Sequence, residues 1–243
     1  MSGHRHQDDL TNNLTSLLRE MEERRHKKVR SKLRMFFWDS TVRISYALKR
    51  FFDIVLSVLM LVALSPLFIV IATVIKMTSR GPVFFIQERV GYYGRSFMFY
   101  KFRSMYVDAE ERKRALMERN ESKDGVIFKM KNDPRITPFG RILRKTSMDE
   151  LPQLLNVLLG DMSLVGPRPP LPSEVRQYSL EDRKRLNIKP GITCIWQVSG
   201  RSDIPFKKQV ELDKEYIQSQ SLWKDLLVLL RTIPAILSGK GAY

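Results

Sequence analysis

Two adjacent carboxylates, Asp149 and Glu150, are the residues of this 243-residue chain best suited to chemistry. Basic side chains surround them in the sequence: Arg135, Arg141, Arg144, Lys145 and Arg168. Arginine forms bidentate contacts with phosphate, and proteins hold Mg²⁺ with one or two carboxylates together with phosphate oxygens. A carboxylate can also attack phosphorus and form an acyl phosphate. The pattern therefore predicts a site for an anionic ligand that contains phosphate.

The same two carboxylates also fit a structural role at the start of a helix over residues 150–159. Proline is tolerated only in the first turn, so Pro152 can be the third helical residue. Asp149 is then the N-cap, and Glu150 suits the positive end of the helix dipole. The local pattern alone favours capping, whereas the neighbouring cations favour chemistry.

Composition excludes several other kinds of site. The chain has 42 Lys and Arg against 26 Asp and Glu, a net charge of +16, so an anionic partner is expected. A single cysteine, Cys194, rules out an internal disulfide framework and a multi-cysteine zinc site. All three histidines lie within the first 26 residues, which argues against a histidine triad or a catalytic metal held by histidines. The sequence also lacks a Walker A motif and a strand–GxGxxG–helix pattern.

Residues 54–75 form an uncharged apolar run of 22 residues, which as a helix would extend about 33 Å, enough to cross a bilayer core. Ser65-Pro66 lies in the middle of the run, where proline removes a backbone hydrogen bond. Residues 24–50 hold ten Lys or Arg and one acid, and residues 76–103 hold six and one. Because basic flanks stay on the cytoplasmic side, we expect both ends there. This favours a re-entrant helix-break-helix over a kinked spanning helix.

The remaining sequence predicts an α+β, mostly helical fold. We expect a basic N-terminal extension over 1–45, the re-entrant membrane helix over 46–78 and a cytoplasmic catalytic domain over 79–243. Residues 82–90 and 96–105 read as a hairpin, 108–121 as a charged helix, and 126–130 as a short strand. An apolar stripe near the C-terminus suits either the core or an amphipathic interfacial helix; it comprises Trp223, Leu226, Leu227, Leu230, Ile233 and Leu237.

Several stretches, in this order, resemble the bacterial sugar transferase family, the monotopic polyprenyl-phosphate phosphoglycosyltransferases. They are KRFFDI (49–54), Ser65-Pro66, SRGPVFFIQERVGYYGRSFMFYKFRSM (79–105), DPRITPFGRILRKTSMDELPQLLNVLLGDMSLVGPRP (133–169) and KPGITCIWQVSGR (189–201). The last stretch is similar to the branch that transfers hexose phosphates, usually of glucose or galactose, for exopolysaccharide, capsule or O-antigen assembly. Larger members of that branch carry additional transmembrane helices and a further domain ahead of the catalytic unit.

The resemblance implies a two-step reaction with Mg²⁺. Asp149 would attack the β-phosphate of a UDP-sugar and expel UMP, and undecaprenyl phosphate would then take the phosphosugar. Glu150 would help Asp149 to hold the metal or would handle a proton. Ser65 and Pro66 would mark the break in the membrane helix.

The resemblance also implies substrate-binding roles for residues outside the carboxylate pair. Arg144 and Arg168 match phosphate-binding positions, and Asp213 matches an acidic position near the site. Lys49 and Arg50 match a basic pair at the membrane boundary, near the lipid phosphate.

The expected partners are a UDP-sugar, undecaprenyl phosphate and the lipids of the bacterial inner membrane, without nucleic acid. The oligomeric state is left open, with a homodimer among the alternatives. Two other functions are compatible with parts of the sequence. A basic membrane-bound scaffold or nucleic-acid binder fits the charge and the aromatic residues of 84–99, but gives Asp149 and Glu150 no role. A glycosyltransferase that moves sugar without phosphate would release a nucleoside diphosphate instead.

Overall fold

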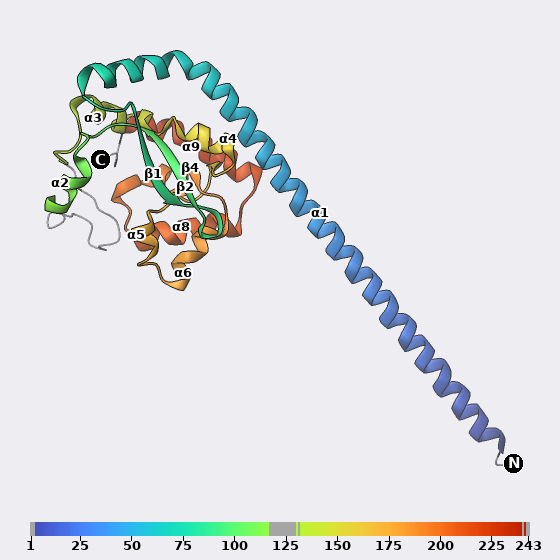
Figure 1. Cartoon of the computed structure of the whole chain (residues 1–243). Coiled ribbons are helices and arrows are strands. Elements are labelled where there is room, and N and C mark those ends of the chain that lie inside the picture. Colours follow the sequence, from blue (N-terminus) through green and yellow to red (C-terminus); the bar gives the residue numbers. More distant parts are fainter. Residues whose placement is uncertain (1–2, 117–129, 131, 240, 242–243) are drawn as a thin grey trace. The chain divides into compact units, whose positions relative to one another are not determined.

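The computed structural model describes residues 3–116, 130, 132–239 and 241 (Figure 1). The chain divides into two compact units, Met1–Leu48 and Lys49–Tyr243. One long helix, α1 (Gly3–Thr78), accounts for the described part of the first unit and continues into the second. The second unit contains both sheets and every site residue predicted from the sequence.

The second unit is mostly helical and contains two small sheets, so the predicted α+β, mostly helical fold is confirmed. After α1, the described elements follow in this order: β1 (Phe84–Val90), β2 (Ser96–Phe102), α2 (Ala109–Leu116), α3 (Pro138–Lys145), α4 (Gln153–Leu159), β3 (Ser163–Val165), α5 (Pro172–Val175), α6 (Leu180–Arg183), β4 (Gly191–Thr193), α7 (Ile195–Ser199), α8 (Phe206–Gln218) and α9 (Leu222–Ser238).

The predicted hairpin is confirmed. β1 and β2 pair antiparallel in a register that runs from Phe84↔Phe102 to Val90↔Ser96. A short 3-10 turn, Tyr92–Gly94, joins them, and Gly94 takes the positive φ of 77° that such a turn favours. The predicted charged helix is confirmed over α2, while residues 117–121 lie outside the described residues. Of the strand predicted at 126–130 only Met130 is described, so that strand stays a prediction.

The second sheet is a parallel pair of short strands, β3 and β4. The two strands approach closely where a glycine faces a glycine. A Cβ added to Gly191 would lie 2.0 Å from the backbone nitrogen of Gly166, so a larger residue cannot occupy this position without moving the strand. This pair holds the start of the loop that carries Arg168.

The apolar half of α1 is long and apolar enough to cross a membrane, and only 11% of its most apolar window is buried. A core helix of this length would be mostly buried, so the exposure favours a membrane-bound helix. Parts of the helix nevertheless pack against the rest of the unit: Asp53 and Ser57 are buried near its base, and its last turns are buried as well. Ile71 and Ile75 join Phe102 of β2 and Leu143 of α3 in a buried cluster.

The helix continues without interruption through Ser65-Pro66, and Figure 1 shows α1 bent in its teal part. Proline lacks the N–H group that would bond the carbonyl of Val62, four residues earlier. The Ser65 hydroxyl donates to this same carbonyl at 2.8 Å and so replaces the missing donor. The structure thus has one continuous helix across Ser65-Pro66, and the helix-break-helix in the membrane stays a prediction.

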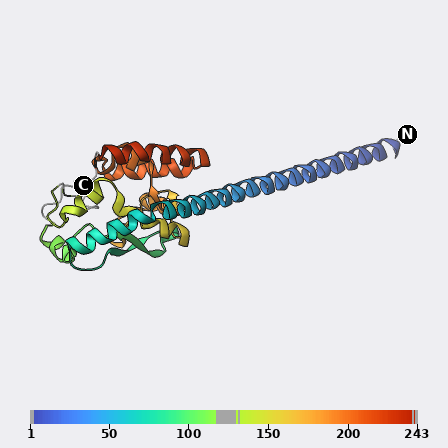
Figure 2. The ribbon, with the colours of Figure 1, turned by 90° about the horizontal axis from the view of Figure 1, so that it is seen from above.

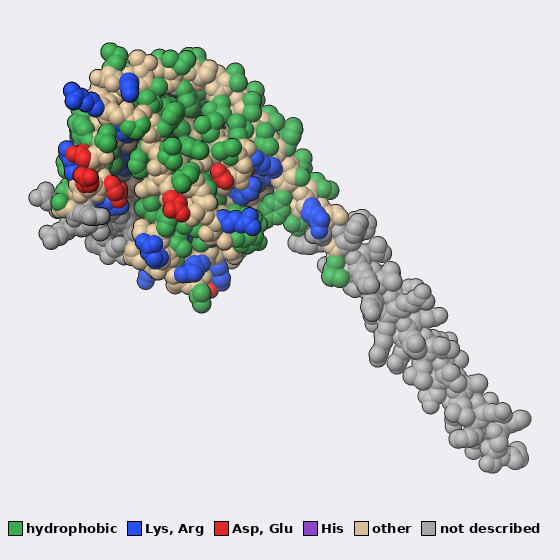
Figure 3. Space-filling view, in the orientation of Figure 1, with side chains coloured by type: hydrophobic (Ala, Val, Ile, Leu, Met, Phe, Trp, Pro, Cys, Tyr) green, Lys and Arg blue, Asp and Glu red, His purple; other side chains and the backbone are tan. Residues whose placement is uncertain are grey.

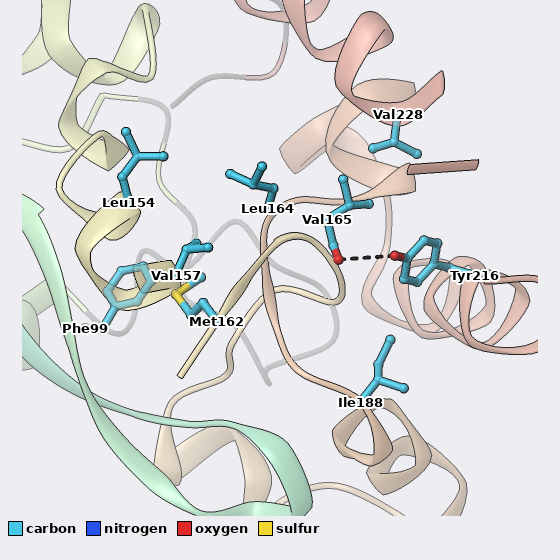
Figure 4. Close-up of a cluster of buried hydrophobic side chains, with 9 residues drawn as sticks. All are labelled: Phe99, Leu154, Val157, Met162, Leu164, Val165, Ile188, Tyr216 and Val228. Atoms are coloured by element: carbon cyan, nitrogen blue, oxygen red, sulfur yellow. Dashed lines mark hydrogen bonds between the residues drawn. The ribbon is translucent and has the colours of Figure 1, made fainter. Parts of the chain in front are cut away.

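The main core lies beneath the hairpin and joins side chains from β2, α4, β3, α8 and α9 (Figure 4): Phe99, Leu154, Val157, Met162, Leu164, Val165, Ile188, Tyr216 and Val228. Each large apolar side chain buried in this way stabilises the fold by about 1.5–3 kcal/mol. Since α4 and β3 lie within this core, the loops at their ends have a rigid base.

Helix α9 buries one face and exposes an apolar one. Its buried face includes Asp225 and Val228, whereas the whole stripe singled out in the sequence is exposed, with Trp223 at 67% and Leu237 at 82%. The interfacial alternative is therefore favoured over a core position. Figure 2, which looks from above, shows α9 (red) and the end of α1 (teal) on the viewer's side of this unit.

Candidate active site

Asp149 and Glu150 lie on a 3-10 turn, Met148–Glu150, between α3 and α4. Ser147, just before the turn, has a left-handed backbone with φ 55°, which redirects the chain after α3. Helix α4 begins only at Gln153, and no side chain caps either the turn or the helix. The capping role that the local pattern favoured for Asp149 is therefore wrong, because the proline starts a new helix after the carboxylates.

Helix α3 is seated against the end of β2 and brings Arg144 to the site. Thr137 caps the helix by accepting a hydrogen bond from the backbone nitrogen of Gly140 at 2.9 Å. A Cβ on Gly140 would lie 1.9 Å from the carbonyl oxygen of Ser104, so glycine is required for this close approach.

Lys101 of β2 bridges the two carboxylates. Its Nζ lies 2.7 Å from Glu150 Oε1 and 3.5 Å from Asp149 Oδ2. Asp149 is 6% exposed, and burial raises the pKa of its carboxyl, although Lys101 partly opposes the shift. For Glu150, burial also favours the neutral form, but Lys101 outweighs it and the pKa is lowered. The lysine thus offsets the repulsion between two adjacent carboxylates, of which Asp149 is buried and Glu150 is partly exposed.

The carboxylates open into a cavity of ≈ 1090 Å³ whose walls are rich in cations. Among its described lining residues, eight Lys or Arg face six Asp or Glu. Arg89 and Arg168 both line it, and burial together with the charge of Arg168 lowers the pKa of Arg89 to about 10. Like charges gathered in one cavity favour an anion between them.

The loop that carries Arg168 is fixed by backbone hydrogen bonds on both sides. The backbone nitrogen of Gly191 donates to Pro167 O at 2.9 Å, and that of Val90 donates to Pro170 O at 2.9 Å. Arg89 adds a bond from Nη1 to Pro169 O at 3.1 Å. Proline has no backbone N–H group, so each of these prolines is held through its carbonyl oxygen, which accepts the hydrogen bond.

Asp149, Glu150, Arg144 and Arg168 thus come together in one cavity. Asp213 is not among the described residues that line it; it forms a buried pair with Arg185, at 2.5 Å. Burial raises the pKa of Asp213 to about 6, even though Arg185 opposes the shift.

Lys49 and Arg50 contact the protein itself and are also not among the described lining residues. The Nζ of Lys49 lies 2.5 Å from Asp225 Oδ2. Arg50 donates to the carbonyls of Val157 and Leu158, at 2.5 and 2.9 Å, and so satisfies the last carbonyls of α4. In this conformation both cations fasten α1 to the second unit.

Only Arg144 and Arg168 of the eight cations were predicted as site residues, and three of those not predicted, Arg89, Lys101 and Arg201, bear on the carboxylate pair. All three lie inside the family-like stretches, but they are far in sequence from the carboxylates. The alternation of β2 could have grouped Lys101 with Phe99 and Phe97 on one face. Nothing local shows that this face meets Glu150.

The described residues contain no group of three or more acidic, histidine or cysteine side chains that could enclose a metal ion. Mg²⁺ at phosphate sites takes only one or two carboxylates and completes its shell with water and phosphate oxygens. Asp149 and Glu150 fit such a partial site. Lys101 would then either keep its contacts with their carboxylate oxygens beside the ion or give up those contacts to the ion.

A carboxylate pair in a cation-lined cavity, on a unit that begins with an exposed apolar helix, agrees with the family expected from the sequence. Residues 44–239 match the model of the bacterial sugar transferase family, and the chain belongs to that family.

Individual relatives are similar over most of this chain. A galactosyl transferase, CpsE of Streptococcus agalactiae, is 52% identical over 66% of this chain and 36% of its own length. The undecaprenyl-phosphate galactose phosphotransferase of Salmonella typhimurium is 44% identical over 83% of this chain and 43% of its own length. The exopolysaccharide production protein ExoY of Sinorhizobium fredii is 40% identical over 80% of this chain and 88% of its own length. The chain thus spans about two fifths of the first two relatives and most of the third.

Proposed function

We propose that this protein transfers a hexose-1-phosphate from a UDP-sugar to undecaprenyl phosphate, giving undecaprenyl-diphosphate-sugar and UMP. Galactose and glucose are the expected sugars. The product would be the first lipid-linked intermediate of exopolysaccharide, capsule or O-antigen assembly. The observation that carries the proposal is the buried Asp149, held beside Glu150 by Lys101 in a cation-lined cavity.

In the first step, an oxygen of Asp149 attacks the β-phosphorus of the UDP-sugar. The bond from that phosphorus to the bridging oxygen breaks, and UMP leaves with the electron pair. The sugar phosphate is then joined to Asp149 as an acyl phosphate. Burial supports this role because a poorly solvated carboxylate is a stronger nucleophile than one fully hydrated by water.

In the second step, a phosphate oxygen of undecaprenyl phosphate attacks the same phosphorus. The bond to Asp149 breaks and the free carboxylate returns. Arg168 and Arg144 hold phosphate oxygens in both steps, since their planar donors suit bidentate contacts. Glu150 helps to hold Mg²⁺ with Asp149, and the ion, when bound, neutralises charge on the diphosphate.

We further propose that the protein is monotopic in the bacterial inner membrane, with the second unit on the cytoplasmic side. The basic flanks of the apolar run support this orientation, because both favour the cytoplasmic face. Pro66 lies inside the helix, and because an internal proline kinks a helix, it supports a helix that enters and leaves by that face. Cytoplasmic UDP-sugar and membrane-embedded lipid would then meet at one interface.

The identity of the released nucleotide tests the reaction. The full chain, held in nanodiscs, would be given UDP-galactose or UDP-glucose with Mg²⁺ and undecaprenyl phosphate. We expect UMP and a lipid diphosphate product. Release of UDP would instead establish plain glycosyl transfer, and no nucleotide release with any UDP-hexose would leave a binding function.

A further inference from the structure

Arg201 is a cation of the cavity to which the reaction above gives no task. It ends the stretch KPGITCIWQVSGR and lines the same cavity as Asp149 and Glu150. Its Nη2 donates to the hydroxyl of Ser147 at 3.3 Å, two residues before Asp149. A residue far along the chain is thereby attached to the base of the carboxylate turn.

Both partners of this hydrogen bond have strained backbones. Among the described non-glycine residues, only Tyr93, Ser147 and Arg201 have positive φ, and the last two stand at 55° and 53°. Such conformations are costly and persist where the surroundings hold them, often beside a bound ligand. Two of the three strained residues thus meet at the rim of one cavity.

The wall around Arg201 also holds N–H donors without acceptors. Arg201 Nη1 and the indole nitrogen of Trp196 are covered from solvent and lack a hydrogen-bond partner among the described residues. Trp196 is 4% exposed and lines the same cavity. A buried donor without an acceptor is unfavourable, so a ligand that brings oxygen atoms to this wall would relieve the cost after a small side-chain shift.

Arg89, Lys101 and Arg168 line a second, very small cavity together with Glu150, and Arg201 is not among the described residues that line it. Lys101 of this group touches the nucleophile Asp149, at 3.5 Å. The phosphate that Asp149 attacks should therefore lie near Lys101. The second phosphate of the diphosphate then needs a different binding residue.

We propose that Arg201 binds the phosphate of the departing nucleotide. This inference rests on the proposed function. When the bond between the β-phosphorus and the bridging oxygen breaks, the nucleotide phosphate gains negative charge. A guanidinium already in place stabilises that charge without reorganisation, and the bond to Ser147 keeps it beside the turn that carries the nucleophile.

The test is UMP binding by the full chain in nanodiscs, measured by calorimetry for wild type, Arg201→Gln and Arg201→Lys. Uridine, which lacks the phosphate, serves as the second probe. We expect Arg201→Gln to weaken UMP binding about ten- to hundredfold, the loss of a charge-assisted contact, and to leave uridine binding unchanged. Arg201→Lys should recover part of the loss. Arg231→Gln on the exposed side of α9 is the matched control and should bind UMP as wild type does.

UMP affinity within twofold of wild type in Arg201→Gln would overturn the proposal, as would an equal loss for UMP and uridine. If the glutamine variant does not fold, Arg201→Lys decides: unchanged UMP affinity together with an unchanged rate of UMP release overturns the proposal. UMP release from UDP-galactose by the same wild-type preparation separates this outcome from a failure of the proposed function. Wild type that releases UMP while Arg201→Gln binds it normally contradicts only the role of Arg201.

Discussion

Lys101 controls the charge of the carboxylate pair at the residue scale. Two neighbouring carboxylates repel each other when both are ionised, and burial adds to that cost. The lysine lies within reach of both and opposes both effects, so that the pKa of Glu150 is lowered and that of Asp149 rises less than burial alone would raise it. Nucleophilic attack needs the ionised form of Asp149.

The pH dependence of turnover follows from these pKa directions. Since the pKa of Asp149 is raised, kcat/KM for the UDP-sugar should rise with pH through a pKa above the usual aspartate range. Lys101→Met removes the positive charge that opposes the rise, so this acid limb should move to higher pH. A pH–rate profile of nucleotide release measures the shift.

Lys208→Met is the matched control, because Lys208 is exposed and pairs with the exposed Glu211, away from the cavity. Its acid limb should coincide with that of wild type. An acid limb that stays in place, or moves to lower pH, in Lys101→Met would show that Lys101 does not set the ionisation of Asp149.

The sequence identified the carboxylate pair and two of its arginines because charge and proximity in the chain mark them. It could not reveal Lys101, Arg89 or Arg201, which reach the site only through the hairpin and through the segment after β4. It also offered no reason to separate Asp213 from the site, since burial against Arg185 arises from the packing of α8.

At the scale of elements, one hydrogen-bonded group joins the base of the membrane helix to the core. Asp225 of α9 accepts from Lys49 of α1 and from the hydroxyl of Tyr216 of α8, both at 2.5 Å. Lys49 and Tyr216 also donate to the carbonyl of Val165 in β3, at 3.2 and 3.1 Å, and Figure 4 shows the second of these bonds. The Asp225 carboxylate thus links α9 to α1 and α8. The same two donors also link this group to β3 through the carbonyl of Val165.

Asp225→Asn should lower the free energy of unfolding by about 1–3 kcal/mol, since Lys49 is left largely buried without its counter-charge. Denaturant unfolding of the full chain in detergent measures the change. Glu211→Gln, which breaks the exposed pair with Lys208, is the control and should leave stability unchanged. Equal stability of the two variants would mean that the Asp225 group contributes no more than a surface ion pair.

Element boundaries were predictable where a local pattern determines them and not elsewhere. The aromatic alternation and the glycine-flanked turn predict β1 and β2 correctly. The turn at Met148–Glu150 was mistaken for the start of a helix, because no local pattern reveals the left-handed backbone of Ser147, whose hydroxyl contacts the distant Arg201. The parallel pair of β3 and β4 joins short segments far apart in the chain, which no local period reveals.

At the scale of the molecule, apolar side chains gather on one face of the second unit. Figure 3 shows hydrophobic side chains crowded on the upper part of this unit, with more of the Lys and Arg below. The exposed residues of α1 and α9 account for much of the exposed apolar surface. A continuous apolar face of this kind is typical of proteins that lie on a membrane.

The position of Pro66 inside the apolar helix gives a prediction about topology. Pro66→Ala restores the missing backbone hydrogen bond and should favour a straight helix that spans the bilayer, which would move residue 40 to the other side. Ser40→Cys provides a probe for a membrane-impermeant maleimide in cells. The native Cys194 is buried, and burial raises its pKa well above the usual value, so it should not react.

We expect residue 40 to be cytoplasmic when Pro66 is intact and periplasmic in the Pro66→Ala variant. The Ser40→Cys variant with Pro66 intact is the reference, and permeabilised cells show the full extent of labelling. A cytoplasmic residue 40 in both forms would remove proline as the cause of the turn.

The covalent intermediate on Asp149 is the central claim, and trapping it is the most direct test. The chain of residues 1–243 in nanodiscs would be mixed with Mg²⁺ and UDP-hexose labelled in the sugar, without undecaprenyl phosphate. We predict a burst of UMP that does not exceed the amount of enzyme, with labelled sugar phosphate retained on wild type and lost on adding the lipid. Asp149→Asn should show neither the burst nor the retained label. Equal label on both proteins, or UMP release by wild type that begins only with the lipid, would contradict the account.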